Sequence, residues 1–171
     1  MRLFFALNFS NNTKARLVSL QDELRLQSVG GNFTAPENLH LTLAFLGECS
    51  PKQLISAKIA LNLMKIELMN IQIDCLGCFR RDAGDIWWAG VAENDALMKL
   101  QRELSNKLIS VGFKLDNRKY NPHITLARDI TVHSSLREIE PFDETILEVE
   151  LMKSERMRGK MVYTAVHVKT C

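Results

Sequence analysis

The sequence contains one four-residue pattern twice, as His-Leu-Thr-Leu at residues 40–43 and as His-Ile-Thr-Leu at residues 123–126. The two copies lie 83 residues apart (123 − 40 = 83). Side chains of a β-strand alternate between its faces, so the His and Thr of each copy would share one face. A single histidine of this kind is explained as a core or surface residue, but two matched copies indicate a site.

Two histidines on opposite sides of a cleft suit paired acid–base catalysis, because an ordinary histidine can hold or release a proton near neutral pH. The two threonine hydroxyls can donate hydrogen bonds to the oxygens of an anionic substrate. An anion that is attacked on one side and loses a group on the other indicates phosphoryl chemistry. A phosphodiester fits, since each of its two ester oxygens gives one histidine a proton to move.

Other site chemistries fit these residues less well. Hydroxyls are weak metal ligands, and neither motif contains a carboxylate, so two His and two Thr make a poor metal site. No Ser or Cys nucleophile stands beside either histidine with an acid to orient it. A strained cyclic phosphate is already activated, so we expect neither a metal nor another cofactor.

Strict alternation assigns the neighbouring residues to faces. In the first copy Ala44 and Leu46 fall on the face of the histidine, while Phe45 falls on the opposite face and is expected in the core. In the second copy Ala127 falls on the face of the histidine. Arg128 falls opposite His123, so it reaches a cleft only if the strand ends or twists there.

The elements that must position these motifs follow from hydrophobic periodicity and turn residues. The sequence predicts a strand at 2–9, helix 11–29, strand 39–46, helix 50–69, strands 71–79 and 85–91, helix 94–113, strand 122–128, a helical turn at 134–139, and strands 145–155 and 160–170. Each half of the chain thus holds a motif strand followed by a strand pair. This repetition indicates duplication, with two lobes that face each other across a cleft and share one core.

Specific residues are predicted to begin and end the helices. Asn11 or Asn12 is expected to cap the first helix, and Ser50 with Pro51 at the first helical position is expected to begin the second. Asn94 or Asp95 is expected to cap the third. An apolar stripe on the second helix is predicted to face the core: Leu54, Ile55, Ile59, Leu63 and Ile66.

Composition and charge set only broad limits. The chain has 171 residues, 46% apolar and 25% charged, with a formal net charge of +2, as in ordinary globular proteins. No apolar stretch approaches a membrane span and the first strand lacks the features of a signal peptide, so we expect a cytoplasmic protein.

The cysteines are expected to play no part in a site. In a cytoplasmic protein all four are expected to be free thiols. Cys75 and Cys78 form a C-x-x-C pattern, but in a strand-like run without further ligands they are expected to be packed side chains.

These motifs and their surroundings resemble the two-histidine (2H) phosphoesterase superfamily, and within it the RNA 2′,3′-cyclic phosphodiesterases of the LigT type, formerly called 2′-5′ RNA ligases. The resemblance rests on RLFFAL at the start, NLHLTLAFLGE, the WW-x-G strand, PHITLAR and the closing GKMVY. It implies an α+β fold in which residues 1–171 form a single bilobal domain, with antiparallel sheets lining a central cleft and helices outside. It further implies hydrolysis of RNA 2′,3′-cyclic phosphate ends to 2′-phosphomonoesters without metal.

The resemblance also assigns roles to residues of this chain. His40 is the implied proton donor and His123 the implied proton acceptor, with Thr42, Thr125 and Arg128 binding the phosphate. The residues themselves do not distinguish the two histidine roles.

Other residues are assigned with less direct support. Tyr120 and Arg118 precede the second motif and are candidate RNA contacts. One of Trp87 and Trp88 is expected in the core and the other at the cleft. His133 and His167 repeat no motif and are expected to be non-catalytic.

The expected partners are RNA ends or nucleotides that carry a 2′,3′-cyclic phosphate, with no membrane and a monomeric protein. Two other reactions at the same site remain open: ATP-independent 2′-5′ joining of RNA ends, and hydrolysis of a small cyclic-phosphate nucleotide. A third alternative is a non-catalytic module that binds RNA ends, which the presence of both His and both Thr disfavours.

Overall fold

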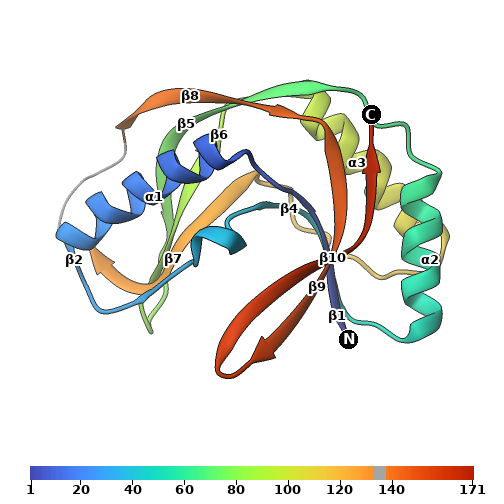
Figure 1. Cartoon of the computed structure of the whole chain (residues 1–171), viewed down its shortest axis with the longest axis horizontal. Helices are drawn as coiled ribbons and strands as arrows, with labels where there is room; N and C mark the ends of the chain where they lie inside the picture. The colour runs from blue at the N-terminus through green and yellow to red at the C-terminus, as the bar shows by residue number, and fades with distance from the viewer. Residues whose placement is uncertain (133–137) are drawn as a thin grey trace.

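Two antiparallel sheets form the centre of the computed structural model, which describes residues 1–132 and 138–171 (Figure 1). The first sheet has the strand order β10 (Lys160–Thr170), β9 (Glu148–Met157), β1 (Arg2–Leu7) and β4 (Leu41–Glu48). The second has the order β2 (Ser28–Val29), β7 (His123–Val132), β6 (Asp85–Val91), β5 (Met69–Phe79) and β8 (Glu138–Ile146), and β3 (Asn32–Phe33) also pairs with β7. The α+β class and the two sheets agree with the prediction.

The two halves of the sequence contribute to both sheets, which the sequence did not indicate. The strand pair β5 and β6 follows the first motif, yet it joins β7 of the second motif. The pair β9 and β10 follows the second motif and joins β1 and β4 of the first. Following β1 to β10 along the chain, the path crosses between the two sheets four times. Core residues of both sheets belong to one contiguous cluster. That residues 1–171 form a single bilobal domain stays a prediction.

Both motif strands contain an extra residue at the same position of the motif. On β4, Thr42 lies opposite Ala6 while Ala44 lies opposite Phe5, so Leu43 is the extra residue. On β7, Thr125 lies opposite Trp88 and Ala127 opposite Trp87, so the extra residue is Leu126. Each is a β-bulge, which bends the strand and shifts the alternation of side chains by one.

The bulges overturn part of the predicted alternation. Ala44 and Ala127 are buried in the core instead of sharing the face of the histidines, and Leu46 packs partly against the core. Phe45, predicted in the core, is 50% exposed. Arg128 is exposed as well, on the side of His123. Beyond the bulge, residue 45 in one copy and residue 128 in the other thus turn to the face of their motif histidine.

A glutamine from a helix binds the carbonyl of each bulged leucine. Gln21 of α1 (Asn11–Leu26) donates through Nε2 to the Leu126 carbonyl at 2.8 Å. Gln101 of α3 (Asp95–Ser110) donates through Nε2 to the Leu43 carbonyl at 3.3 Å. The Leu126 carbonyl also accepts from the Thr34 backbone N–H at 2.9 Å. Because a buried carbonyl without a partner would be costly, these bonds stabilise the bulges. Gln21 itself is almost fully buried.

The helices begin near the predicted residues, but the second is shorter than predicted. Ser50 caps α2 (Pro51–Asn62) and forms a capping box with Gln53, as the sequence indicates. Ser10, rather than Asn11 or Asn12, caps α1. Asn94 caps α3 as predicted.

The predicted core stripe of α2 is wrong in part. Ile55, Ile59 and Leu63 are exposed, and the face of α2 that is buried instead carries Ala57, Ala60 and Leu61. The small alanines let the helix approach its neighbours closely. The prediction followed side-chain size and therefore chose the wrong face.

Strand β8 was not predicted, because Pro141 and its many charged residues are unusual in a strand. It is the edge strand of the second sheet, where proline is tolerated. Of the helical turn predicted at 134–139, residues 138–139 belong to β8, and the rest lies outside the described residues, as does His133. No helix formed by the described residues is long and apolar enough to cross a membrane.

Candidate active site

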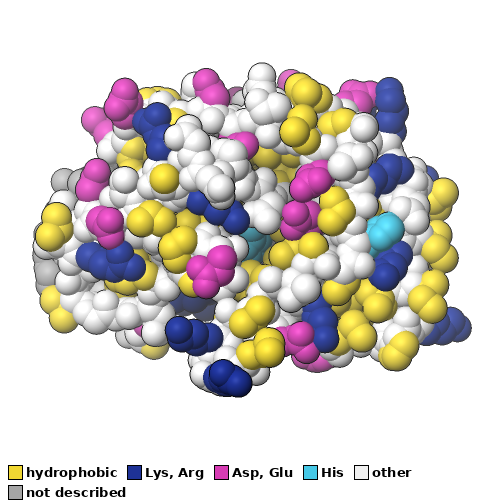
Figure 2. Space-filling view, viewed as in Figure 1, with side chains coloured by type: hydrophobic (Ala, Val, Ile, Leu, Met, Phe, Trp, Pro, Cys, Tyr) yellow, Lys and Arg dark blue, Asp and Glu magenta, His cyan; other side chains and the backbone are white. Residues whose placement is uncertain are grey.

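A cleft of about 500 Å³ contains all five residues that the motifs identify. His40 and Thr42 line it from the first sheet, and His123, Thr125 and Arg128 line it from the second. Figure 2 shows a histidine recessed in a hollow near the middle of one face of the molecule. The fold thus brings together the two copies of a motif that lie half a chain apart.

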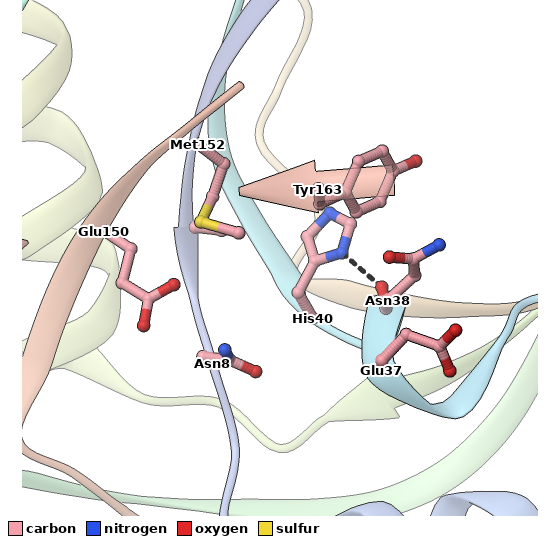
Figure 3. Close-up of a pocket in the computed structure, with 8 residues that line it drawn as sticks. Asn8, Glu37, Asn38, His40, Glu150, Met152 and Tyr163 are labelled. Atoms are coloured by element: carbon pink, nitrogen blue, oxygen red, sulfur yellow. Dashed lines mark hydrogen bonds between the residues drawn. The ribbon is translucent and has the colours of Figure 1, made fainter. Parts of the chain in front are cut away.

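The two histidine rings are held by the same bond. Nδ1 of His40 lies 2.7 Å from the Asn38 carbonyl, a bond drawn in Figure 3, and Nδ1 of His123 lies 2.7 Å from the Asn121 carbonyl. A carbonyl only accepts, so each Nδ1 carries the proton and donates it. In the neutral ring Nε2 is therefore the free basic nitrogen.

Each histidine also lies between two aromatic rings. Phe4 and Tyr163 have ring centroids 4.9 and 5.3 Å from that of His40. Phe79 and Trp88 stand at 5.2 and 5.9 Å from His123. Such contacts restrict ring rotation and keep Nε2 directed, as a proton-transfer group requires.

Two glycines make room for the Trp88 indole. A Cβ at Gly77 would lie 2.3 Å from the Trp88 ring, and a Cβ at Gly90 would lie 2.5 Å from the Cys75 sulfur and 3.0 Å from that ring. Trp87 is buried in the core. Of this tryptophan pair one is thus in the core, as predicted, and the other contacts a motif histidine.

The backbone of each motif threonine is tied to the opposite motif region. The Thr34 hydroxyl, shortly before the first motif, donates to the Thr125 carbonyl at 2.9 Å. The Tyr120 hydroxyl, shortly before the second motif, donates to the Thr42 carbonyl at 2.9 Å. Each bond ties one motif strand to the segment that precedes the other motif, and each uses the threonine carbonyl and not its hydroxyl. The Thr42 hydroxyl itself lies 3.0 Å from Nε2 of His40.

Tyr120 thus has a structural role through this bond, and its contact with RNA stays a prediction. Its hydroxyl is used in the bond to Thr42, and burial raises the pKa of the phenol. Arg118 is exposed and pairs with Asp116, and it does not line the cleft. Its contact with RNA stays a prediction.

The neighbourhood of His40 disfavours a positive charge on its ring. Burial holds the pKa of His40 below its ordinary value of 6.5, and the cations Lys14 and Arg128 lower it further, against the opposing effect of the bond to Asn38. In the free protein His40 is thus neutral at pH 7. A bound anion would act in the opposite direction, because a nearby negative charge stabilises the protonated ring.

We expect a titration to reveal this effect. Followed by NMR, the ring of His40 should titrate with a midpoint below 6.5, and Lys14→Met should move the midpoint upward because it removes a neighbouring cation. The His167→Ala variant removes the signal of a half-buried histidine that lies outside the cleft, and it should leave the His40 midpoint unchanged. A wild-type midpoint above 6.5 would contradict the burial argument, and an unchanged midpoint in Lys14→Met would contradict the charge argument.

Sequence reasoning missed several residues of the cleft. Asn38 and Asn121 each precede a motif histidine by two positions, so the repeat is longer than four residues and includes the asparagine whose carbonyl orients the ring. Arg2, Arg156 and Tyr163 also line the cleft, from β1, β9 and β10. No repeat marks these three, because they come from strands that reach the cleft only through sheet pairing.

The remaining histidine and the cysteine pair lie elsewhere. Nε2 of His167 lies 2.7 Å from the Asn62 side-chain oxygen, and His167 does not line the cleft. Cys75 and Cys78 lie in β5, as predicted, and both are free thiols. Within residues 1–132 and 138–171, no three His, Cys, Asp or Glu side chains gather as metal ligands.

A family model and several known proteins are similar to this chain over most of its length. The family model described as LigT like Phosphoesterase matches residues 7–88 and 90–163. An RNA 2′,3′-cyclic phosphodiesterase of Thermotoga maritima is 31% identical over 131 residues, which cover 75% of this chain and 70% of that protein. One of the same name from Methanothermobacter thermautotrophicus is 27% identical over 98% of this chain and 97% of its own length.

The fold has matches among solved structures. The crystal structure of E. coli LigT complexed with 3′-AMP superposes with a TM-score of 0.87 at 25% identity, covering 99% of this chain and 97% of that one. The PDE domain of MHV ns2 superposes with a TM-score of 0.54 at 14% identity, covering 85% of this chain and 97% of that one. The second likeness shows the fold alone.

Proposed function

The chain belongs to the LigT-like phosphoesterase family, and from this premise we propose that it hydrolyses 2′,3′-cyclic phosphate ends of RNA to 2′-phosphomonoesters. The observation that carries the proposal is the single cleft into which both His-x-Thr pairs project. The curated relatives named RNA 2′,3′-cyclic phosphodiesterase support the substrate class, and the E. coli LigT structure complexed with 3′-AMP supports a nucleotide ligand.

The two histidines act on opposite sides of the phosphorus. His123 accepts a proton from water through Nε2 as the water oxygen forms its bond to phosphorus, while its Nδ1–H keeps donating to the Asn121 carbonyl. His40 donates its Nε2 proton to the 3′-oxygen as the phosphorus–3′-oxygen bond breaks. The phosphate then remains on the 2′-oxygen, and the two histidines end with their protonation states exchanged.

The donor role of His40 requires that it gain a proton as the substrate enters. Its pKa is held low in the empty cleft, chiefly by burial, and the negative charge of the cyclic phosphate raises it. The Thr42 hydroxyl lies 3.0 Å from Nε2. When the ring is protonated, Nε2 only donates, so the hydroxyl proton is free to point toward the phosphate.

Charge on the phosphate is stabilised by three side chains. The Thr42 and Thr125 hydroxyls donate to the two non-bridging oxygens, and the Arg128 guanidinium supplies a fixed positive charge at the same cleft. Because the bulge at Leu126 is what turns Arg128 to this side, the electrostatic part of the site depends on the irregularity of β7. Ring strain already activates the substrate, so these groups suffice without a metal.

The proposal also concerns the compartment in which the protein works. We propose a cytoplasmic protein, which four free thiols and an RNA substrate both favour. Its substrate there is an RNA end produced by cleavage that leaves a cyclic phosphate.

The test is the identity of the product. The protein is incubated, with and without EDTA, with a short RNA that ends in a 2′,3′-cyclic phosphate, and the product is compared with synthetic 2′- and 3′-phosphate standards. The expected product is the 2′-phosphate, formed at the same rate in EDTA. A 3′-phosphate product would reverse the assignment of the leaving oxygen, and absence of any product would refute the proposed activity.

A further inference from the structure

The tip of the β9–β10 hairpin extends beyond its sheet. Strand β1 pairs with β9 only from Glu150 to Ser154, while β9 and β10 continue to pair with each other as far as Met157 and Lys160. Figure 1 shows this part of the hairpin projecting away from the body of the molecule. We call residues 155–162 the hairpin arm.

The arm continues the wall of the cleft. Side chains of directly opposed residues share a face, so Arg156 and Met161 of the arm lie on the same face as the pair Ser154 and Tyr163. All four line the cleft. Arg2, opposite Ser154 on β1, also lines it, with its guanidinium over the Phe45 ring at 4.9 Å.

The arm carries positive charge that is not neutralised within the described part of the chain. Arg156, Arg158 and Lys160 form no ion pair within 4.0 Å with a described residue, and the arm's carboxylate, Glu155, is paired with Lys153 at 2.6 Å. Figure 2 shows Lys and Arg side chains around the projecting end of the molecule. The arm therefore presents a net positive field beside the cleft.

The turn at the tip of the arm holds an arginine at a backbone conformation that other residue types adopt at lower energy. Arg158 has a φ of 49° and Gly159 a φ of 82°, the two positive values of a type I′ turn. Asn, Asp or Gly is favoured at the first of these positions, and a long side chain there has a backbone cost. Arg158 nevertheless occupies this position, so the arm carries three cations with Arg156 and Lys160.

Arg156 lies far along the sheet from Thr42, too far for both to bind the same phosphate. Thr42 is opposite Ala6, and Ala6 is opposite Glu150, six residues before Arg156 on β9. At about 3.4 Å per residue this separation is about 20 Å of strand. An RNA strand whose end occupies the cleft would extend along this wall, and its preceding phosphates are the anions within reach.

We propose that Arg2 and the hairpin arm form a track for the backbone phosphates of the nucleotides that precede the cyclic-phosphate end, so that the site selects RNA strands over mononucleotides. The inference rests on the proposed function and adds a substrate preference to it. Phosphate contacts carry no sequence information, so the track favours length and not sequence. Its contribution falls as salt rises, because each bound phosphate releases counterions.

The experiment compares two substrates of the same chemistry. Turnover is measured on a short RNA that ends in a 2′,3′-cyclic phosphate and on a 2′,3′-cyclic mononucleotide, for wild type, Arg156→Gln and the double variant Arg158→Gln/Lys160→Gln. Arg156→Gln should raise KM for the RNA about tenfold, the loss of one charged contact, with kcat unchanged. Turnover of the mononucleotide should stay within twofold, and Arg102→Gln, an exposed arginine on α3, is the matched control.

A measurement of RNA affinity tests the phosphate track independently of the proposed catalytic activity. The affinity for a labelled RNA that ends in a 3′-phosphate is measured over a range of salt concentrations. Each arginine lost from the track should reduce the logarithmic salt slope by about 0.7, the value for single strands.

Equal loss on both substrates would overturn the track, because Arg156 would then act at the cyclic phosphate itself. Equal kcat/KM of the wild type for RNA and mononucleotide would overturn it as well. If neither substrate were turned over, the proposed activity would fail, and an unchanged RNA affinity and salt slope in the variants would then overturn the track independently.

Discussion

Replacing His40 or His123 by Ala is expected to lower kcat on a cyclic-phosphate RNA end by a factor on the order of 10² to 10⁴, the range for loss of a positioned general acid or base. Each ring lines the cleft with Nδ1 bound to a backbone carbonyl, so Nε2 is the group that is lost. The double variant should be little worse than either single variant, because the two proton transfers belong to one step.

His167→Ala is the matched control, since that ring bonds to Asn62 and lies outside the cleft. It should keep full activity, and circular dichroism should show that both motif variants remain folded. Activity within tenfold of wild type in a folded His40→Ala or His123→Ala protein would remove that histidine from the mechanism.

A substrate with a better leaving group separates the two roles. A 4-nitrophenyl phosphodiester expels its aryl oxide without help from an acid, so the loss in His40→Ala should shrink on this substrate while the loss in His123→Ala persists. The reverse pattern would exchange the donor and acceptor assignments.

Replacing Thr125 by Val is expected to lower kcat by about 10²-fold to 10³-fold, as removal of one preorganised donor to a developing negative charge does. The substitution keeps the shape of the side chain, and the carbonyl of residue 125 still accepts the Thr34 bond, so β7 should stay in place. Thr164→Val, at an exposed position on β10, is the control and should be neutral. An unchanged kcat in Thr125→Val would show that this hydroxyl does not meet the phosphate.

Thr42→Val should act in two ways. It removes a donor to the phosphate, as in the other motif, and it also removes the group 3.0 Å from Nε2 of His40. The His40 titration should therefore shift in Thr42→Val and stay the same in Thr125→Val. Both measurements use the folded protein without substrate, so they remain informative whatever the activity.

The central pair of each motif could be read from the sequence because it depends on local geometry. Residues i and i+2 of a strand share a face, which placed His40 beside Thr42 and His123 beside Thr125 without any knowledge of the partner strands. The same holds for Ser50 at the start of α2, whose capping box is formed within four residues. Duplication of the motif then indicated that two such pairs act together.

Two features could not be predicted locally, because the partner of a residue was distant in sequence. The α2 stripe was assigned by side-chain size, but the neighbours that α2 packs against selected its alanine face. The bond from the Tyr120 hydroxyl to the Thr42 carbonyl joins residues that lie 78 positions apart. The residues next to α2 and next to Tyr120 in the sequence do not indicate these distant partners.

By itself the sequence determined which groups we propose for the chemistry, since the repeated His and Thr and the alternation of a strand suffice to place them on one face. Only the tertiary structure decided which further residues join them. The bulges at Leu43 and Leu126 depend on the pairing partners in β1 and β6 and on bonds from Gln101 and Gln21. Those long-range bonds shift the alternation by one residue, and that shift is what turns Phe45 and Arg128 into the cleft.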